Sequence, residues 1–197
     1  MGRLAAACVF LFFLPAAMHP QGAFHGSLEK GVYTNSTMGF RYNAPPGMVD
    51  ITADARAQVQ QRAAASHRAS VFSILLALVS GPDDTSPDWH SMGIQAFPRT
   101  AFRGSDDLHA ESLMNASVAR GGLSIGPNQS VSFSNQHFVA TQFEMHEGAL
   151  TKHATVYTTV RDGDLLSFDF SGNSADQVAK MTDTMKSLSF SLSGAAH

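Results

Sequence analysis

The chain has 197 residues, a formal net charge of −3 at pH 7 and a hydrophobic fraction of 44%. This mildly acidic balance, without a cluster of Lys and Arg, excludes a typical nucleic-acid-binding protein and a polybasic membrane-surface helix. The hydrophobic fraction, with several aromatic-rich runs, excludes a disordered chain.

Residues 1–23 have the order of a cleavable secretory signal peptide. Arg3 precedes a nearly unbroken apolar stretch over residues 4–14, and small residues follow it. The stretch is shorter than the roughly 20 residues that a membrane-spanning helix needs, and Pro15 ends it. We therefore expect an exported, extracytoplasmic protein, periplasmic or secreted, without a stable membrane anchor.

Cleavage is expected after Ala23, with Ala17 as the alternative, so residues 24–197 form a single mature domain. Since Cys8 is the only cysteine, that domain has no disulfide, catalytic cysteine or thiolate metal site. Cys8 lies near the start of the apolar stretch, whereas a lipid-attachment cysteine follows such a stretch. Without Arg3, 12 Lys plus Arg remain against 16 Asp plus Glu, a balance of −4.

The mature chain begins with short strand-forming segments at residues 32–33 and 39–42, which flank a turn. A helix is expected from Thr52 toward His67, because this segment is rich in good helix formers. Its apolar stripe is thin and consists of Ala55, Val59 and Ala63. We therefore expect the helix to lie shallowly on a larger element.

Residues 70–79, SVFSILLALV, are apolar at both alternating sets of positions, which predicts a strand covered on both faces. The next loop carries Asp83, Asp84 and Asp88. Their spacing does not match an EF-hand, so we expect a solvated acidic loop rather than a calcium site. A further strand is expected around residues 92–97.

A second helix is expected to begin at Ser105, with Asp106 and Asp107 in its first turn, where the helix dipole favours acidic side chains. Gly121 and Gly122 would end it.

The last third of the chain predicts an antiparallel meander. Residues 139–145 alternate between apolar and polar side chains, and Gly148-Ala149 has the signature of a type II′ hairpin loop. In this register three cross-strand pairs are expected: Phe143 with Ala154, Thr141 with Val156, and Glu144 with His153.

Asp162-Gly163 predicts a second hairpin, which leads into a strand over residues 165–170. A two-residue loop would place Phe168 on the face of Tyr157, whereas a three-residue loop would place it with Val156. The sequence leaves both registers open.

A terminal helix follows, in which Ser174 and Gln177 have the spacing of a capping box. Its apolar stripe consists of Val178, Met181, Met185 and Leu188. A short last strand is expected over residues 189–192.

Both ends of the mature chain resemble the PsbP-like family. Residues 31–48, GVYTNSTMGFRYNAPPGM, are similar to the start of these domains. The Asp-Gly hairpin, the segment LLSFDF and the segment ADQVAKMTDTMKSLSF are similar to their end. The family includes the extrinsic PsbP subunit of photosystem II and many small exported bacterial proteins, and a Ran-binding nuclear import factor shares the fold.

The resemblance implies an α+β fold, a mostly antiparallel sheet sandwiched between helices in a PsbP-like α/β/α arrangement. The five to seven strands and three helices expected from the residues are consistent with it. The resemblance also implies a non-catalytic role in binding. It carries no metal-binding or partner-binding motif onto residues of this chain.

Nine histidines raise the question of a metal site. The one set with a structural argument is Glu144, His146 and His153, at one end of the predicted hairpin, because two imidazoles and a carboxylate are plausible zinc ligands. The two histidines would be diagonal neighbours about 7 Å or more apart. We therefore favour a cross-strand Glu–His pair on a partly solvated surface, and we expect no metal and no cofactor.

The sequence contains no Gly-x-Ser-x-Gly elbow, Walker loop or dinucleotide-binding fingerprint. We expect a non-catalytic exported domain, not an enzyme, that binds a protein partner or a small ligand through a sheet edge or a loop surface. A small extracytoplasmic hydrolase and a metal-binding protein are the alternatives.

Overall fold

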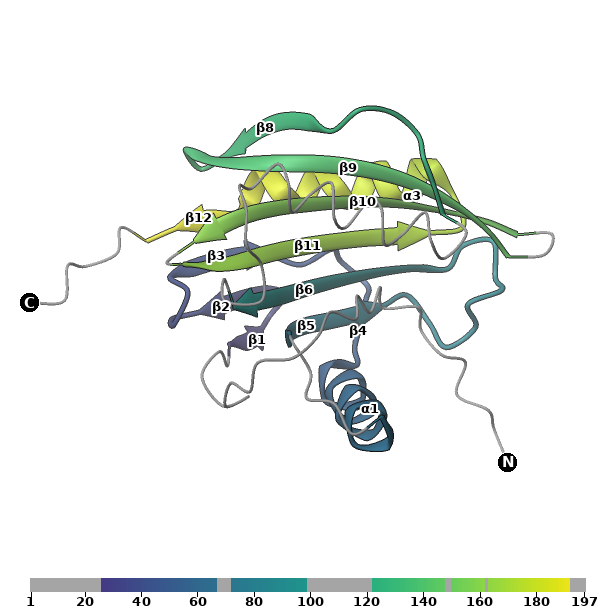
Figure 1. The fold of residues 1–197 in the computed structure, drawn as a ribbon, viewed down its shortest axis with the longest axis horizontal. Helices are drawn as coiled ribbons and strands as arrows, with labels where there is room; N and C mark the ends of the chain where they lie inside the picture. Colours follow the sequence, from purple (N-terminus) through teal and green to yellow (C-terminus); the bar gives the residue numbers. More distant parts are fainter. Residues whose placement is uncertain (1–25, 67–71, 99–121, 148–149, 162, 192–197) are drawn as a thin grey trace, which may run out of the picture.

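The computed structural model describes residues 26–66, 72–98, 122–147, 150–161 and 163–191. Its strands are β1 (Ser27–Glu29), β2 (Val32–Asn35), β3 (Phe40–Asn43), β4 (Val49–Asp50), β5 (Ser73–Val79), β6 (His90–Pro98), β7 (Gly122–Ser124), β8 (Gln129–Phe133), β9 (Gln136–Glu147), β10 (Leu150–Arg161), β11 (Asp164–Gly172) and β12 (Ser189–Phe190). Its helices are α1 (Thr52–Ala65), α3 (Ala175–Thr182) and a 3-10 helix (Asp183–Ser187) (Figure 1). The predicted signal peptide, Cys8 and the helix predicted from Ser105 lie outside the described residues.

The larger of two sheets has the strand order β4-β5-β6-β11-β10-β9-β7, with β8 also paired to β9. Its centre is the predicted antiparallel meander, and the predicted register is confirmed. Ala154 pairs with Phe143, Val156 with Thr141, and His153 with Glu144.

The second hairpin of the meander has a two-residue loop, because Arg161 pairs with Asp164. Phe168 therefore pairs with Tyr157 and shares its face. Of the two registers that the sequence left open, the structure has the one with the shorter loop.

The strand β5 is buried on both faces, as its continuous apolar run predicted. Its register with β6 shifts between Ile74 and Leu76. Arg56 of α1 donates from Nε to the carbonyl oxygen of Ile74 (2.8 Å) and from Nη2 to that of Leu75 (3.0 Å). The guanidinium thus satisfies backbone acceptors at this irregularity, where the ladder is disrupted.

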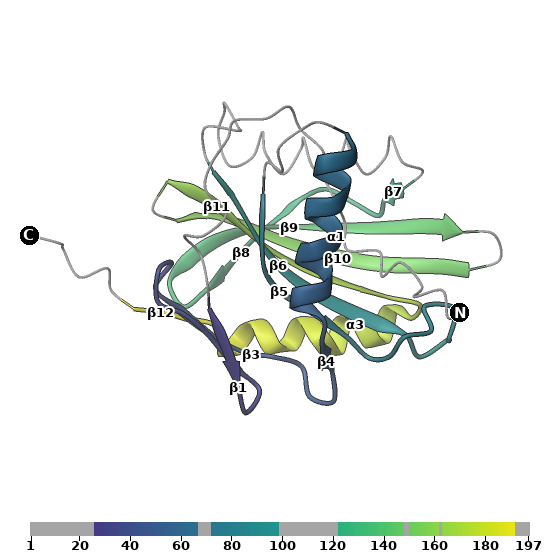
Figure 2. The same ribbon diagram turned by 90° about the horizontal axis from the view of Figure 1, so that it is seen from below.

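The helix α1 lies against β5 (Figure 2). Only Thr52, Ala55 and Val59 of this helix are buried, which confirms its shallow packing. Its apolar side chains join a small core with Phe72, Phe97 and Leu165.

The opposite face of the large sheet carries the main core. A four-stranded sheet, β1-β2-β3-β12, packs there. Phe40 and Tyr42 of β3 meet Phe168 of β11 edge-on, with 5.8 and 5.6 Å between ring centroids. Such aromatic pairs stabilise a core beyond the area that they bury.

The terminal helix α3 and the 3-10 helix that follows it complete this layer. The predicted stripe is buried throughout, with Val178 and Met181 in α3, Met185 in the 3-10 helix and Leu188 directly after it. The predicted capping box is wrong. Ser174 occupies the N-cap position but makes no side-chain capping hydrogen bond. The Gln177 amide instead donates to a carboxylate oxygen of Asp88 at 3.2 Å, so it does not reach back to the helix start.

The α+β class and the antiparallel sheet are confirmed, but "sandwiched between helices" is a poor description. In the described ranges one α-helix lies on each face, α1 against β5 and α3 against β10, β11 and β6. On the face that carries α3, much of the covering layer is the four-stranded sheet β1-β2-β3-β12. The sequence predicted most of its strands but not their pairing into a separate sheet, since this pairing joins β3 to β12 from the far end of the chain.

Candidate functional site

The face of the large sheet that carries α1, here the α1 face, is polar at its centre. Strand pairing places alternate residues of β6, β9, β10 and β11 on it. The buried polar residues on this face are Ser91, Gln95, Thr141, Thr158, Ser167, Asp169 and Ser171. The opposite face presents Ile94, Phe168 and Phe170 to the main core. Buried polar groups need hydrogen-bond partners within the fold, so this region is a polar network rather than an apolar core.

Asp169 is the central residue of this polar region and is 6% exposed. Its carboxylate accepts hydrogen bonds from Nε2 of Gln95 (2.7 Å) and from the Ser167 hydroxyl (2.5 Å). Burial raises the pKa of Asp169 from its ordinary 3.8 to about 7, and the Ser167 hydrogen bond offsets part of that increase. The carboxyl group therefore changes its charge near neutral pH, which makes it a candidate functional group.

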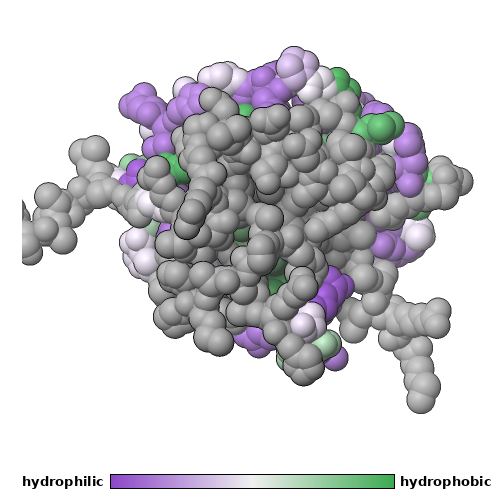
Figure 3. All heavy atoms as spheres, in the orientation of Figure 1, coloured by the Kyte–Doolittle hydropathy of each residue, from purple (hydrophilic) through white to green (hydrophobic). Residues whose placement is uncertain are grey.

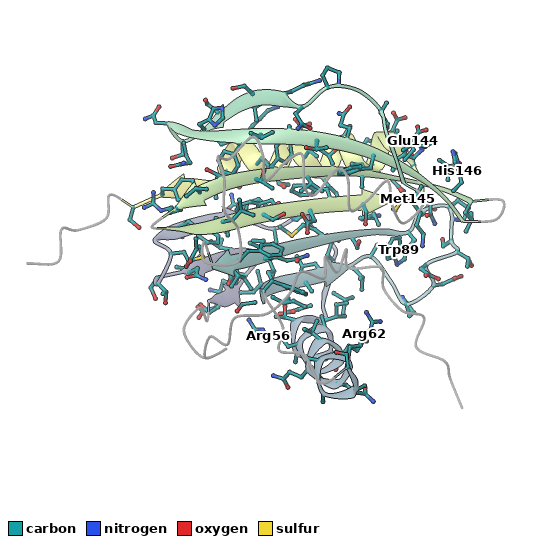
Figure 4. All side chains as sticks on the ribbon, viewed as in Figure 1. Arg56, Arg62, Trp89, Glu144, Met145 and His146 are labelled. Carbon is teal, nitrogen blue, oxygen red and sulfur yellow. The ribbon has the colours of Figure 1, made fainter. Side chains whose placement is uncertain are left out.

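A buried lysine lies farther along the same face. Lys152 is 2% exposed, with Nζ 3.8 Å from a carboxylate oxygen of Asp84 and 5.4 Å from the centre of the Trp89 ring. A buried ammonium group needs such an anionic partner. Trp89 lies at the same end of the sheet as Met145 of β9 (Figure 4).

The expectation of a freely solvated acidic loop is therefore wrong for Asp84. Asn173 also holds this loop against the sheet, because its Nδ2 donates hydrogen bonds to the carbonyl oxygens of Asp84 (3.0 Å) and Ser86 (2.7 Å). Asp83 is fully exposed, and hydrogen bonds from Thr85 lower its pKa. One carboxylate of the loop thus compensates a buried charge, while another stabilises a local turn.

The predicted metal set comes together only in part. Nδ1 of His153 lies 3.3 Å from Oε1 of Glu144, with both side chains partly exposed, as expected for a cross-strand pair. His146 instead has Nδ1 3.1 Å from the Thr151 hydroxyl. Among the described residues there is no group of three or more His, Cys, Asp and Glu side chains that could hold a metal ion.

One Ser–His contact occurs at the surface, where Oγ of Ser130 lies 2.8 Å from Nε2 of His137. The described residues show no hydrogen bond or ion pair from this imidazole to an acid, so a Ser-His-Asp arrangement is not formed here. A search of the described residues for helices long and apolar enough to cross a membrane found none.

The outer edge of the large sheet is formed by β7 and β8, which both pair with β9. The strand β8 pairs with residues 136–140 of β9, and β7 pairs with residues 143–145. Leu123 and Ile125 on this edge are 55% and 51% exposed. Figure 3 shows hydrophobic side chains at the upper right of a mostly hydrophilic rim, toward the β7 end of the sheet.

Sequence reasoning missed Asp169, Lys152 and the β7–β8 edge. A signal for Asp169 was present, because it lies between Phe168 and Phe170 in a strand-like run. Lys152 gave no such signal, since its neighbours Thr151 and His153 are polar. For β7 no signal was available, since its first residue, Gly122, is the second of the two glycines predicted to end a helix.

No protein-family model and no curated protein matches the chain. Among solved structures, cyanobacterial PsbP from Synechocystis is similar with a TM-score of 0.52 and 15% identity, over 81% of this chain and 91% of that one. LpqN of Mycobacterium tuberculosis, involved in cell envelope biogenesis, has a TM-score of 0.40 and 7% identity, over 63% of this chain and 80% of that one.

A third structure, from Bacteroides thetaiotaomicron, has a TM-score of 0.47 and 11% identity, and the match covers 89% of this chain but about half (51%) of that one. The similarity to cyanobacterial PsbP shows that the chain has a PsbP-like fold, as the resemblance of its two ends predicted.

Proposed function

We propose that this chain is an exported, non-catalytic accessory domain that binds an extended segment of a partner protein along the β7–β8 edge. The observation that carries the proposal is the pair of half-exposed apolar side chains, Leu123 and Ile125, on that edge. An edge strand presents backbone N–H and C=O groups to a further strand, and apolar side chains beside it add affinity and specificity.

The composition of this edge supports binding rather than protection. Soluble proteins blunt exposed edges with charged side chains, above all Lys. Residues 122–133, GLSIGPNQSVSF, contain no charged side chain. The opposite edge is the two-residue strand β4, which is too short to template a long pairing.

Export and the absence of catalysis are parts of the same proposal. The order of residues 1–23 supports export. The resemblance to the PsbP-like family also supports an accessory role, because it implies a non-catalytic partner of a larger assembly.

The test is capture of a partner from the envelope of the source cells by three forms of the chain. The edge variant is Leu123→Lys combined with Ile125→Lys, and the matched control is Val49→Lys, which alters a side chain of equal exposure, 55%, on the opposite edge. We expect one protein to be retained by the wild type and by Val49→Lys and to be lost by the edge variant. Equal retention by all three forms would contradict the edge as the binding surface.

A further inference from the structure

A row of residues crosses four strands on the α3 side of the large sheet, where β6 and β10 begin and β9 and β11 end (Figure 1). His90 of β6 pairs with Gly172 of β11, Gly172 pairs with His153 of β10, and His153 pairs with Glu144 of β9. Directly paired residues share a face, so all four lie on one side of the sheet. The row therefore holds two histidines separated by a residue without a side chain.

In each histidine, Nδ1 faces an oxygen that accepts hydrogen bonds. Nδ1 of His90 lies 2.8 Å from the backbone carbonyl oxygen of Asp88, and Nδ1 of His153 lies 3.3 Å from Oε1 of Glu144. Because carbonyl and carboxylate oxygens accept, Nδ1 is the protonated nitrogen of each neutral ring, and Nε2 carries the lone pair. Metal-binding histidines are oriented in this way, with the second nitrogen bonded to a carbonyl or carboxylate.

The spacing of the row suits one ion between the rings. Residues on strands two apart are separated by roughly 10 Å, a distance that two imidazoles can bridge when both Nε2 atoms lie about 2.0–2.1 Å from one metal ion. Glu144 lies on the far side of His153 from Gly172 in this row. A Cβ atom on residue 172 would lie 3.1 Å from Cβ of His90, so only glycine leaves this space open.

We propose that His90 and His153 form a two-histidine site for a divalent transition-metal ion, with water in the remaining positions. Imidazole is a ligand that suits Zn²⁺, Cu²⁺ and Ni²⁺. Glu144 and the Asp88 carbonyl orient the rings rather than bind the ion. The site differs from the set expected from sequence, because His90 takes the place of His146. It lies next to the β7–β8 edge, since Glu144 pairs with Leu123 of β7.

The test is a calorimetric titration of the purified chain with Zn²⁺, and separately with Cu²⁺, near neutral pH. We expect the wild type to bind at least one of the two ions, and His90→Ala and His153→Ala each to weaken that binding by at least about tenfold, since removal of an orienting partner alone costs about that much. His146→Ala is the matched control on the neighbouring strand, and its affinity should equal that of the wild type. Thermal unfolding of each metal-free variant shows whether it is folded.

A second measurement separates ligands from residues that only support the fold. In long-range ¹H–¹⁵N spectra of the imidazoles, the ion should shift Nε2 of both His90 and His153, with Nδ1 of each ring still protonated. Absence of binding by the wild type, loss of binding in His146→Ala but not in His90→Ala, or a shift confined to other histidines would each overturn the proposal.

Discussion

Replacement of Asp169 by Asn tests the buried polar region most sharply. Asn keeps the size of the side chain, and its carbonyl oxygen can still accept from Gln95 Nε2, while its amide can donate to the Ser167 hydroxyl. The substitution therefore removes the ionisation and preserves the hydrogen bonds. The pKa of Asp169 rises from 3.8 to about 7 on burial, so ionisation of this carboxyl destabilises the folded wild type as the pH rises. The Asn variant should not show this pH-dependent decrease in stability.

The sign and size follow from linkage. Below pH 3.8 the carboxyl is protonated in both folded and unfolded chains, so it adds no pH dependence. Between pH 3.8 and 7 the unfolded chain releases a proton that the folded chain retains, and stability falls as the pH rises. A pKa difference of about three corresponds to about 4 kcal/mol, which is the upper bound for the cost above pH 7.

The assay is urea unfolding between pH 5 and 8, followed by the fluorescence of Trp89, which is buried and is the only tryptophan of the chain. We expect the free energy of unfolding of Asp169→Asn to exceed that of the wild type by an increment that grows with pH and reaches at most about 4 kcal/mol. The control is Asp54→Asn, at an exposed carboxyl of α1. If the free energy of unfolding of Asp169→Asn differs from that of the wild type by the same amount at every pH, Asp169 does not ionise as argued.

Three further substitutions test the packing. Phe168→Ala should destabilise the fold by about 3–5 kcal/mol in urea unfolding, because this ring is fully buried among Phe40, Tyr42 and Phe138; a loss below 1 kcal/mol would contradict a tightly packed core. Arg56→Met should cost about 1–3 kcal/mol, since it leaves the carbonyl oxygens of Ile74 and Leu75 without that donor, whereas Arg62→Met, near the exposed end of α1, should be almost neutral. Ser174→Ala should lower the free energy of unfolding by less than the ~1 kcal/mol typical of an N-cap residue, because the Ser174 side chain makes no capping hydrogen bond. A loss of the full ~1 kcal/mol would show that Ser174 does cap the helix.

The sequence predicted the meander well because its signals are local. Alternating residues in β9 and a glycine-containing turn fix the register of a hairpin, so the pairing of Glu144 with His153 followed from the chain alone. The second hairpin needed the structure, since β10 and β11 are largely buried on both faces and their composition does not distinguish the two registers. The pairing of β3 with β12 was out of reach, because no local pattern specifies contacts between chain ends.

The candidate sites were less predictable for the same reason. Asp169 and Gln95 lie 74 residues apart, and their hydrogen bond exists only because β6 and β11 are neighbours. His90 becomes a neighbour of His153 only through Gly172 of the intervening strand. The sequence supplied the residue types, whereas strand order decided which of them meet.

Hydrogen–deuterium exchange of the chain with and without its captured partner tests the edge-binding proposal most directly. Bound partner should slow the exchange of backbone amides in residues 122–133, because a strand added to the β7–β8 edge takes up their outward-facing groups. Amides of β4, on the opposite edge, should be unchanged. Protection confined to β4, α1 or α3, with residues 122–133 exchanging as in the free chain, would contradict the proposal.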